Sequence, residues 1–264
     1  MRNKIVIVTG DPNSINSEIL CKALKRIKNN LKKNIVLIGN CKLLDDQLKK
    51  LKMRISFNKI LNLEGKNLSK KVNIIDVPIK YKDCFKVAEA EASKYVKKSL
   101  LIAHNLSVNK KIKGFINCPI EKKLIKTSKI YGVTEYLARK SNVNNSSEVM
   151  LLFNRKFSVV PLTTHVNIKN IAKKITKSII IKKIKTIHYY YKKIFKLTPR
   201  IAVLGLNPHN SELSKKSEEI KQIIPAIKFL KKSYKVFGPY AADSFFIDHF
   251  KKYNVILGMY HDQV

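Results

Sequence analysis

Short apolar runs alternate along the chain with longer segments in which apolar residues recur at helical spacing. Apolar runs bounded by turn residues are typical of strands in a mostly parallel sheet. They predict strands at 4–9, 34–39, 72–77, 114–118, 148–153, 157–163, 200–206 and 254–260. The helical spacing predicts helices at 17–30, 84–104, 167–196 and 217–232, with Asp83 and Ser217 as candidate N-caps. This alternation predicts an α/β protein.

The segment 121–147 contains no strong strand and is rich in Lys, Ser and Asn. That composition is compatible with a passage between two domains and equally with a surface helix and loop. A chain of 264 residues with 45% hydrophobic content is long enough for one large or two modest domains. We place the boundary so that 1–128 is a first α/β domain and 129–264 a second.

Cellular location is indicated by the apolar runs and the cysteines. No uninterrupted apolar stretch is long enough to span a membrane, and the basic start followed by a short apolar run predicts a first strand rather than a signal peptide. The four cysteines form no C-x-x-C pair, which argues against a zinc ribbon or a disulfide framework and fits a reducing compartment. We therefore expect a cytoplasmic protein without membrane contact.

The chain is strongly basic, with 54 Lys and Arg against 18 Asp and Glu and a formal net charge of +36. Such an excess can mark a nucleic-acid-binding protein, because basic side chains neutralise phosphates. The basic residues are nearly all lysine and are spread over the whole chain, and the abundance of Lys, Ile and Asn fits an AT-rich genome. We interpret the charge as mainly compositional and keep nucleic-acid binding as an alternative.

Three of the six histidines lie just past the ends of predicted strands: His165, His209 and His261. Ligand sites of open parallel sheets lie at the carboxyl ends of the strands. Three imidazoles at such ends suit a divalent transition metal such as Zn²⁺. The carboxylates Asp262 and Glu212 are candidates for orienting these rings. The other three, His104, His188 and His249, lie in predicted helices, where packing or surface roles are expected.

Several motifs in this order resemble the 4-hydroxythreonine-4-phosphate dehydrogenase family of pyridoxal phosphate biosynthesis. They are LGLNPHNSE at 204–212, GPYAADSFF at 238–246 and MYHDQ at 259–263. Shorter likenesses are TGDPNSI after the first strand, CPIEK, YGVTEY and the Thr-Thr-His at 163–165. The resemblance extends from residue 4 to the last residue.

The resemblance implies a two-domain fold similar to isocitrate and isopropylmalate dehydrogenases, forming a homodimer with the site in an interdomain cleft near the partner subunit. His165, His209 and His261 match the family's metal ligands. Asp243 matches a catalytic position, and Thr134 with its neighbour Val133 matches substrate contacts.

The implied reaction is the NAD-dependent oxidation and decarboxylation of 4-phosphooxy-L-threonine to 3-amino-2-oxopropyl phosphate. A bound Zn²⁺, or Mg²⁺ or Co²⁺, would activate the substrate hydroxyl and then the ketone, Asp243 would take or relay the proton, and Thr and Lys donors would hold the phosphate.

This sequence also departs from the family pattern. The family continues beyond the Tyr-His-Asp-Gln motif with a segment that receives NAD and completes the first domain, so we expect a C-terminally truncated member with no nameable NAD-binding residue. Val133 replaces a histidine, 14–17 replace Gly-Ile-Gly-Pro, and Glu121 replaces a small polar residue. A catalytically inactive remnant, or an enzyme completed by a second polypeptide, therefore stays open beside the active enzyme.

Overall fold

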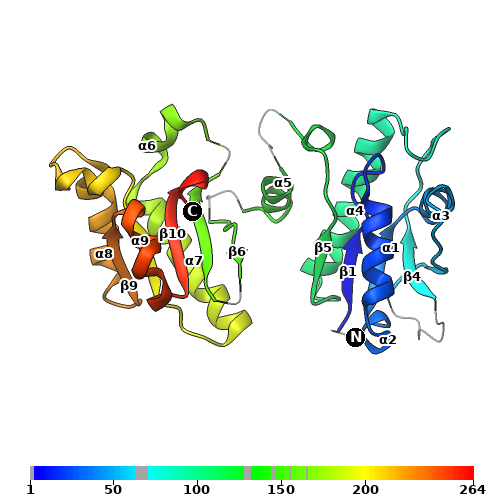
Figure 1. Ribbon diagram of the computed structural model, residues 1–264, viewed down its shortest axis with the longest axis horizontal. Helices are drawn as coiled ribbons and strands as arrows, with labels where there is room; N and C mark the ends of the chain where they lie inside the picture. The colour runs from blue at the N-terminus through cyan, green and yellow to red at the C-terminus, as the bar shows by residue number, and fades with distance from the viewer. Residues whose placement is uncertain (1–2, 64–70, 128–131, 144–146, 155, 165) are drawn as a thin grey trace. The chain divides into compact units, whose positions relative to one another are not determined.

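The computed structural model describes residues 3–63, 71–127, 132–143, 147–154, 156–164 and 166–264. The chain divides into two compact units, 1–141 and 142–264, each built around its own five-stranded sheet (Figure 1). Both sheets are parallel except for one edge pairing in the second unit. The predicted α/β class with mostly parallel sheets is confirmed, and the likeness to isocitrate and isopropylmalate dehydrogenases stays a prediction.

The first unit has the strand order β3-β4-β2-β1-β5. Its strands are β1 (Ile5–Val8), β2 (Ile35–Gly39), β3 (Phe57–Ile60), β4 (Val72–Asp76) and β5 (Gly114–Asn117). Its helices are α1 (Asn16–Arg26), α2 (Asn29–Lys32), α3 (Cys41–Lys50), α4 (Glu89–Val108), the 3-10 turn η1 (Lys122–Leu124) and α5 (Val133–Lys140).

Strand alternation sends the apolar side chains of this sheet into two cores. Val36 and Ile38 of β2 belong to the core that includes α4, whereas Ile35 and Leu37 belong to the core that includes α1 and α3. Side chains of successive strand residues point to opposite faces, so a sheet covered by helices on both faces needs apolar residues at every position. This is why β2 is a continuous apolar run that is buried throughout.

The second unit has the strand order β6-β7-β10-β8-β9. Its strands are β6 (Leu152–Phe153), β7 (Ser158–Thr163), β8 (Ile201–Leu204), β9 (Val236–Tyr240) and β10 (Val255–Tyr260), and β10 lies beside β7 (Figure 1). Its helices are η2 (Ile168–Asn170), α6 (Ile171–Lys174), α7 (Lys177–Phe195), η3 (Pro208–Leu213), η4 (Glu219–Ile223), α8 (Ile224–Leu230), α9 (Ala242–Asp248), η5 (Phe250–Lys252) and η6 (His261–Gln263).

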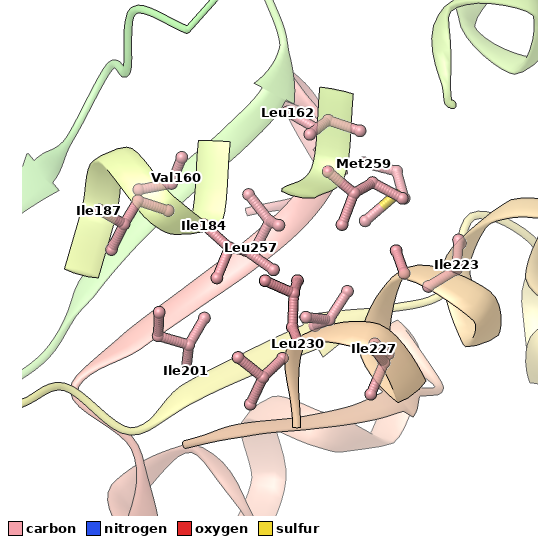
Figure 2. Packing of buried hydrophobic residues seen from close by; sticks show 14 of the residues in the cluster. Val160, Leu162, Ile184, Ile187, Ile201, Ile223, Ile227, Leu230, Leu257 and Met259 are labelled. Carbon is pink, nitrogen blue, oxygen red and sulfur yellow. The ribbon is translucent and has the colours of Figure 1, made fainter. Parts of the chain in front are cut away.

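The main core of the second unit lies between its sheet and the helices α7 and α8. Figure 2 shows Leu257 of β10 and Ile201 of β8 packed with Ile184 of α7 and Leu230 of α8. All four of these side chains are fully buried. A smaller core on the opposite face contains Phe245 of α9 with Ala202, Leu204 and Ile256. The two cores pack against both faces of β8 and β10, the strands that precede the segments of His209 and His261.

The observed domain division differs from the predicted boundary after residue 128. Helix α5 lies within the first unit, because Tyr136 is buried in the core that contains α4, and Val133 and Leu137 pack against that core. Of the two alternatives left open for 121–147, helix α5 fits the helix and loop. In the part of the chain that the structure describes, no helix has the length and apolar content needed to cross a membrane.

Two predicted helices are interrupted for local reasons. Thr176 ends the first part of the predicted helix 167–196, and its hydroxyl accepts a hydrogen bond from the amide of Ile179 at 3.3 Å, so α7 starts anew there. In the predicted helix 217–232, Pro225 has no N–H to donate, and a π-helical turn precedes α8. Ser217 does accept from the amide of Ile220 at 3.3 Å, as expected of a cap.

The N-cap predicted at Asp83 is wrong. Asp83 accepts the amide of Phe85 in a turn, and α4 begins later, at Glu89. The predicted strand 148–153 is also shorter than expected, because only Leu152 and Phe153 pair, antiparallel, with β7.

Candidate active site

The carboxyl ends of β7, β10 and β8 meet at one edge of the second sheet. β10 lies between the other two, and Tyr260 at its end pairs with Thr163 at the end of β7. His261 follows Tyr260 directly, and His209 lies in the turn after β8. The strand order therefore brings the segments of two predicted metal ligands to the same edge. The third predicted ligand, His165, lies outside the described residues.

Side-chain hydrogen bonds tie these strand ends together. The hydroxyl of Thr163 donates to the carbonyl of Met259 at 2.8 Å, which joins β7 to β10. The side-chain amide of Gln263 donates to the carbonyl of Gly205 at 2.7 Å, and its oxygen accepts the backbone amide of Met259 at 2.6 Å. Gln263 thus connects the turn that holds His261 with the start of the loop that holds His209.

The loop after β8 has an unusual backbone at His209. Residues 209–212 all have left-handed conformations, with φ between 48° and 56°. For residues other than glycine this conformation costs roughly 1–2 kcal/mol each, so contacts elsewhere must hold the loop. The result is a solvent-exposed imidazole, and Nδ1 of His209 lies 3.6 Å from Oδ2 of Asp243.

Close packing fixes the start of the loop that contains this turn. Gly205 is so near Asn210 that a Cβ at position 205 would lie 1.9 Å from the side-chain oxygen of Asn210. The amide of Gly205 donates to the carbonyl of Tyr240 at 2.8 Å. Only a residue without a side chain fits at this position.

Glu219 is the functional candidate that sequence reasoning misses. This carboxylate is fully buried, and Oε1 accepts the backbone amides of Leu206 at 2.8 Å and Asn207 at 2.9 Å. Burial would raise the pKa of Glu219, but the hydrogen bonds from Asn207 and Leu206 outweigh it and hold the pKa below the ordinary glutamate value. In the sequence Glu219 looks like any acidic residue in the first turn of a helix.

His261 is oriented by its neighbour. Its Nδ1 lies 2.8 Å from Oδ1 of Asp262, so the ring donates this N–H to the carboxylate and coordination would use Nε2. Both side chains are exposed. The predicted orienting role thus has a supporting contact at Asp262, whereas Glu212 is an exposed residue of the left-handed turn.

The donor set fits a divalent metal in chemistry but is not complete within the described residues. No group of three His, Cys, Asp or Glu side chains that could hold a metal ion occurs among them. His209 and His261 are accessible imidazoles, and one of them has the carboxylate partner that metal-binding histidines usually have. A complete site would need a further ligand such as His165.

Asp243 is positioned by α9. The helix is anchored by Phe245, which is buried and packs against the rings of Tyr240 and Tyr253. Oδ1 of Asp243 accepts the backbone amide of Ser244 at 2.8 Å, and Oδ2 is the atom nearest His209. The structure therefore brings together two residues that the sequence separates widely.

The remaining histidines have the structural roles expected. Nε2 of His104 lies 3.0 Å from the hydroxyl of Ser141, and His188 packs edge-on against Tyr234 at 4.8 Å between ring centroids. His249 stacks on Tyr240 at 6.4 Å.

The predicted substrate contacts Val133 and Thr134 begin helix α5 in the first unit. Val133 is half-buried and packs on the core of that unit, so it offers an apolar surface where the family has a histidine. Their role in substrate binding stays a prediction.

The first loop accommodates the residues that replace Gly-Ile-Gly-Pro without left-handed backbone conformations. None of residues 14–17 has a positive φ. Asn16 is buried, and its side-chain amide donates to the carbonyls of Thr9 at 3.0 Å and Pro119 at 2.8 Å. Gly10, with φ of 76°, lies against the same groups. Asn16 therefore joins the first loop to the segment after β5.

Glu121, which departs from the family pattern, and the nearby Cys118 have ordinary environments. The carboxylate of Glu121 is exposed and pairs with Lys123 at 2.9 Å, which offsets its negative charge. Cys118 is buried, and burial raises the pKa of its thiol to about 11, so it is a poor nucleophile.

Comparisons with known proteins agree with the motifs. Residues 30–264 match the family described as pyridoxal phosphate biosynthetic protein PdxA. The 4-hydroxythreonine-4-phosphate dehydrogenase of Aquifex aeolicus (strain VF5) is 34% identical over 271 residues, covering 100% of this chain and 81% of that relative. A Fusobacterium nucleatum protein provisionally named D-threonate 4-phosphate dehydrogenase is 30% identical over 278 residues, with coverage of 100% and 81%.

A solved structure agrees at the level of the fold. The crystal structure of 4-hydroxythreonine-4-phosphate dehydrogenase from Klebsiella pneumoniae matches with a TM-score of 0.84 and 26% identity, over 99% of this chain and 82% of that one. Together with the motifs at 204–212 and 259–263, these matches show that the chain belongs to the pyridoxal phosphate biosynthetic protein PdxA family of dehydrogenases.

Proposed function

We propose that this chain oxidises and decarboxylates 4-phosphooxy-L-threonine to 3-amino-2-oxopropyl phosphate in pyridoxal phosphate biosynthesis, with NAD as oxidant and a divalent metal as cofactor. The observation that carries the proposal is the edge of the second sheet, where His209 and His261 follow adjacent strands and Asp243 lies 3.6 Å from His209. Family membership supports the reaction class.

The proposed metal ligands are His209 and His261 from this edge and His165 from the sequence. A bound Zn²⁺, Mg²⁺ or Co²⁺ supplies a Lewis acid that makes a substrate hydroxyl more acidic. The protein's part is to hold the imidazoles. Asp262 orients one ring, and the loop contacts of Gln263 and Glu219 hold the segments that carry both.

Asp243 is the proposed base for the substrate hydroxyl. Its exposure allows contact with a ligand, and the amide of Ser244 engages Oδ1. Oδ2, beside His209, is then the oxygen placed to accept a proton near the proposed metal ligands.

The assembly, location and substrate contacts are proposed from the family resemblance. The chain forms a homodimer in the cytoplasm. Thr and Lys donors hold the substrate phosphate, and Val133 and Thr134 contact the substrate. NAD is the proposed oxidant, and no described residue is assigned to it.

NADH absorbance measured with the purified full chain, NAD, Zn²⁺ and 4-phosphooxy-L-threonine tests the function. D-threonate 4-phosphate is the competing substrate, because it carries a hydroxyl where the threonine compound carries an amine. Metal-dependent NADH formation that is faster with 4-phosphooxy-L-threonine supports the proposal. Faster turnover of D-threonate 4-phosphate would contradict it and identify that compound as the preferred substrate.

Zinc binding without turnover of either compound would instead support an inactive remnant. DNA binding that weakens with salt, without zinc binding, would support the nucleic-acid alternative.

A further inference from the structure

Glu219 is a fully buried carboxylate, and its hydrogen bonds from other residues come from one short segment. Oε1 accepts the backbone amides of Leu206 and Asn207, and the side-chain amide of Asn207 donates to Oε2 at 3.0 Å. No lysine, arginine or histidine in the described ranges forms an ion pair with it. The residues that it holds immediately precede the Pro208-His209 pair.

A buried charge without a cation is expensive unless several donors satisfy it. Glu219 meets this condition only while the loop keeps its present backbone, because every group that other residues donate to it belongs to Leu206 or Asn207 of the loop. A neutral apolar residue at 219 would avoid the desolvation cost but leave both amides without this acceptor. The buried carboxylate and the backbone conformation of the loop therefore stabilise each other.

The loop needs such an anchor. Residues 209–212 adopt four successive left-handed conformations, which ordinary residues avoid. Gln263 holds the carbonyl of Gly205 at the start of the loop, and Glu219 holds the next two amides. Each contact lies on the side of the loop that precedes His209.

We propose that Glu219 is a positioning residue, whose buried carboxylate fixes the backbone of 206–207 and thereby directs His209 toward the metal. The inference rests on the proposed function for its metal, but its structural half, the ordering of the loop, stands on the contacts alone. Glu219 touches neither substrate nor metal in this scheme.

The experiment compares wild type, Glu219→Ala, Glu219→Gln and Ile227→Ala by hydrogen exchange and by Zn²⁺ affinity in competition with a chelating dye. Ile227 is buried in α8 and belongs to the main core, so Ile227→Ala controls for lost stability. All measurements are made under conditions in which unfolding curves show that every variant is folded. His209→Ala defines the affinity without this ligand.

Glu219→Ala is expected to speed exchange in 205–212 but not in β10, and to weaken Zn²⁺ binding about 10–100-fold, as for other residues that orient metal ligands. Glu219→Gln keeps an acceptor for the two backbone amides and should lose less. Ile227→Ala should leave Zn²⁺ affinity at the wild-type value.

Unchanged exchange in 205–212 in Glu219→Ala would overturn the inference, and so would wild-type Zn²⁺ affinity in that variant while His209→Ala is impaired. A wild-type chain that binds no Zn²⁺ would contradict the proposed metal function instead. Exchange in the loop would then still decide whether Glu219 orders it.

Discussion

The side-chain nitrogen of Gln263 lies 2.7 Å from the carbonyl oxygen of Gly205, across the gap between two strand ends. The oxygen of the same side chain accepts the amide of Met259, so Gln263 binds a backbone group of β10 and a backbone group just after β8. Gln263 is thus the direct link between the turn of His261 and the loop of His209.

Replacing Gln263 by Ala should loosen both histidine segments. Two backbone groups lose their partner, which predicts a loss of about 1–3 kcal/mol in the free energy of unfolding and weaker Zn²⁺ binding. Urea unfolding and a Zn²⁺ titration measure the two effects. Gln222→Ala is the control, because Gln222 also accepts a backbone amide, that of Lys177, but at an exposed position. Equal effects of the two variants would refute the special role of Gln263.

Gly205→Ala should be far more damaging than Gly114→Ala. A Cβ at 205 meets the side chain of Asn210, whereas a Cβ at 114 has no atom within 4 Å. We expect Gly205→Ala to displace Asn210 and destabilise the chain by about 1–3 kcal/mol, and Gly114→Ala to change stability by less than about 0.5 kcal/mol. Thermal unfolding compares them, and a tolerated Gly205→Ala would mean that the loop is not packed as described.

Glu219 should contribute free energy of unfolding that is lost in acid. Its pKa in the folded chain is lowered, so its stabilisation is complete above the unfolded value of about 4.3 and is lost as the pH falls through the folded pKa. Urea midpoints measured from about pH 7 to about pH 3 should therefore fall more steeply for wild type than for Glu219→Gln. Parallel curves would show that Glu219 titrates alike in both states.

Asp243→Asn should lower turnover and leave Zn²⁺ binding intact. If Asp243 takes the substrate proton, kcat should fall about 10²–10⁴-fold with little change in KM. Steady-state NADH formation measures both constants. Asp83→Asn is the matched control, since Asp83 is an exposed carboxylate of the first unit paired with Lys50. Full activity of Asp243→Asn would remove Asp243 from the proposed chemistry.

The sequence predicts the sheets well where strands are buried on both faces. β2 and β8 are continuous apolar runs because each lies in the interior of its sheet. β3 and β9 are edge strands that were not predicted. Their half-exposed sequences, FNKI and VFGPY, contain polar or turn residues and therefore lack a continuous apolar run. Helix α3 is also absent from the predicted helices, although Asn40, whose side chain accepts the amide of Leu43, is a cap signal for it.

The candidate site was predictable only in part, because sequence position reveals strand ends but not side-chain partners. The histidines stand out since they follow apolar runs, and sheet order explains why His209 and His261 share an edge. The contact between Asp243 and His209, and the burial of Glu219, depend on how α9 and η4 pack against the loop. No local pattern in the sequence contains that information.

The most direct test of the proposed metal site is a Zn²⁺ titration of wild type, His165→Ala, His209→Ala and His261→Ala, with His104→Ala as the control. The proposal predicts one Zn²⁺ per chain, affinity reduced in each of the three variants by more than the about 10–100-fold typical of orienting residues, and no change in the control. Wild-type affinity in His209→Ala or His261→Ala would contradict it.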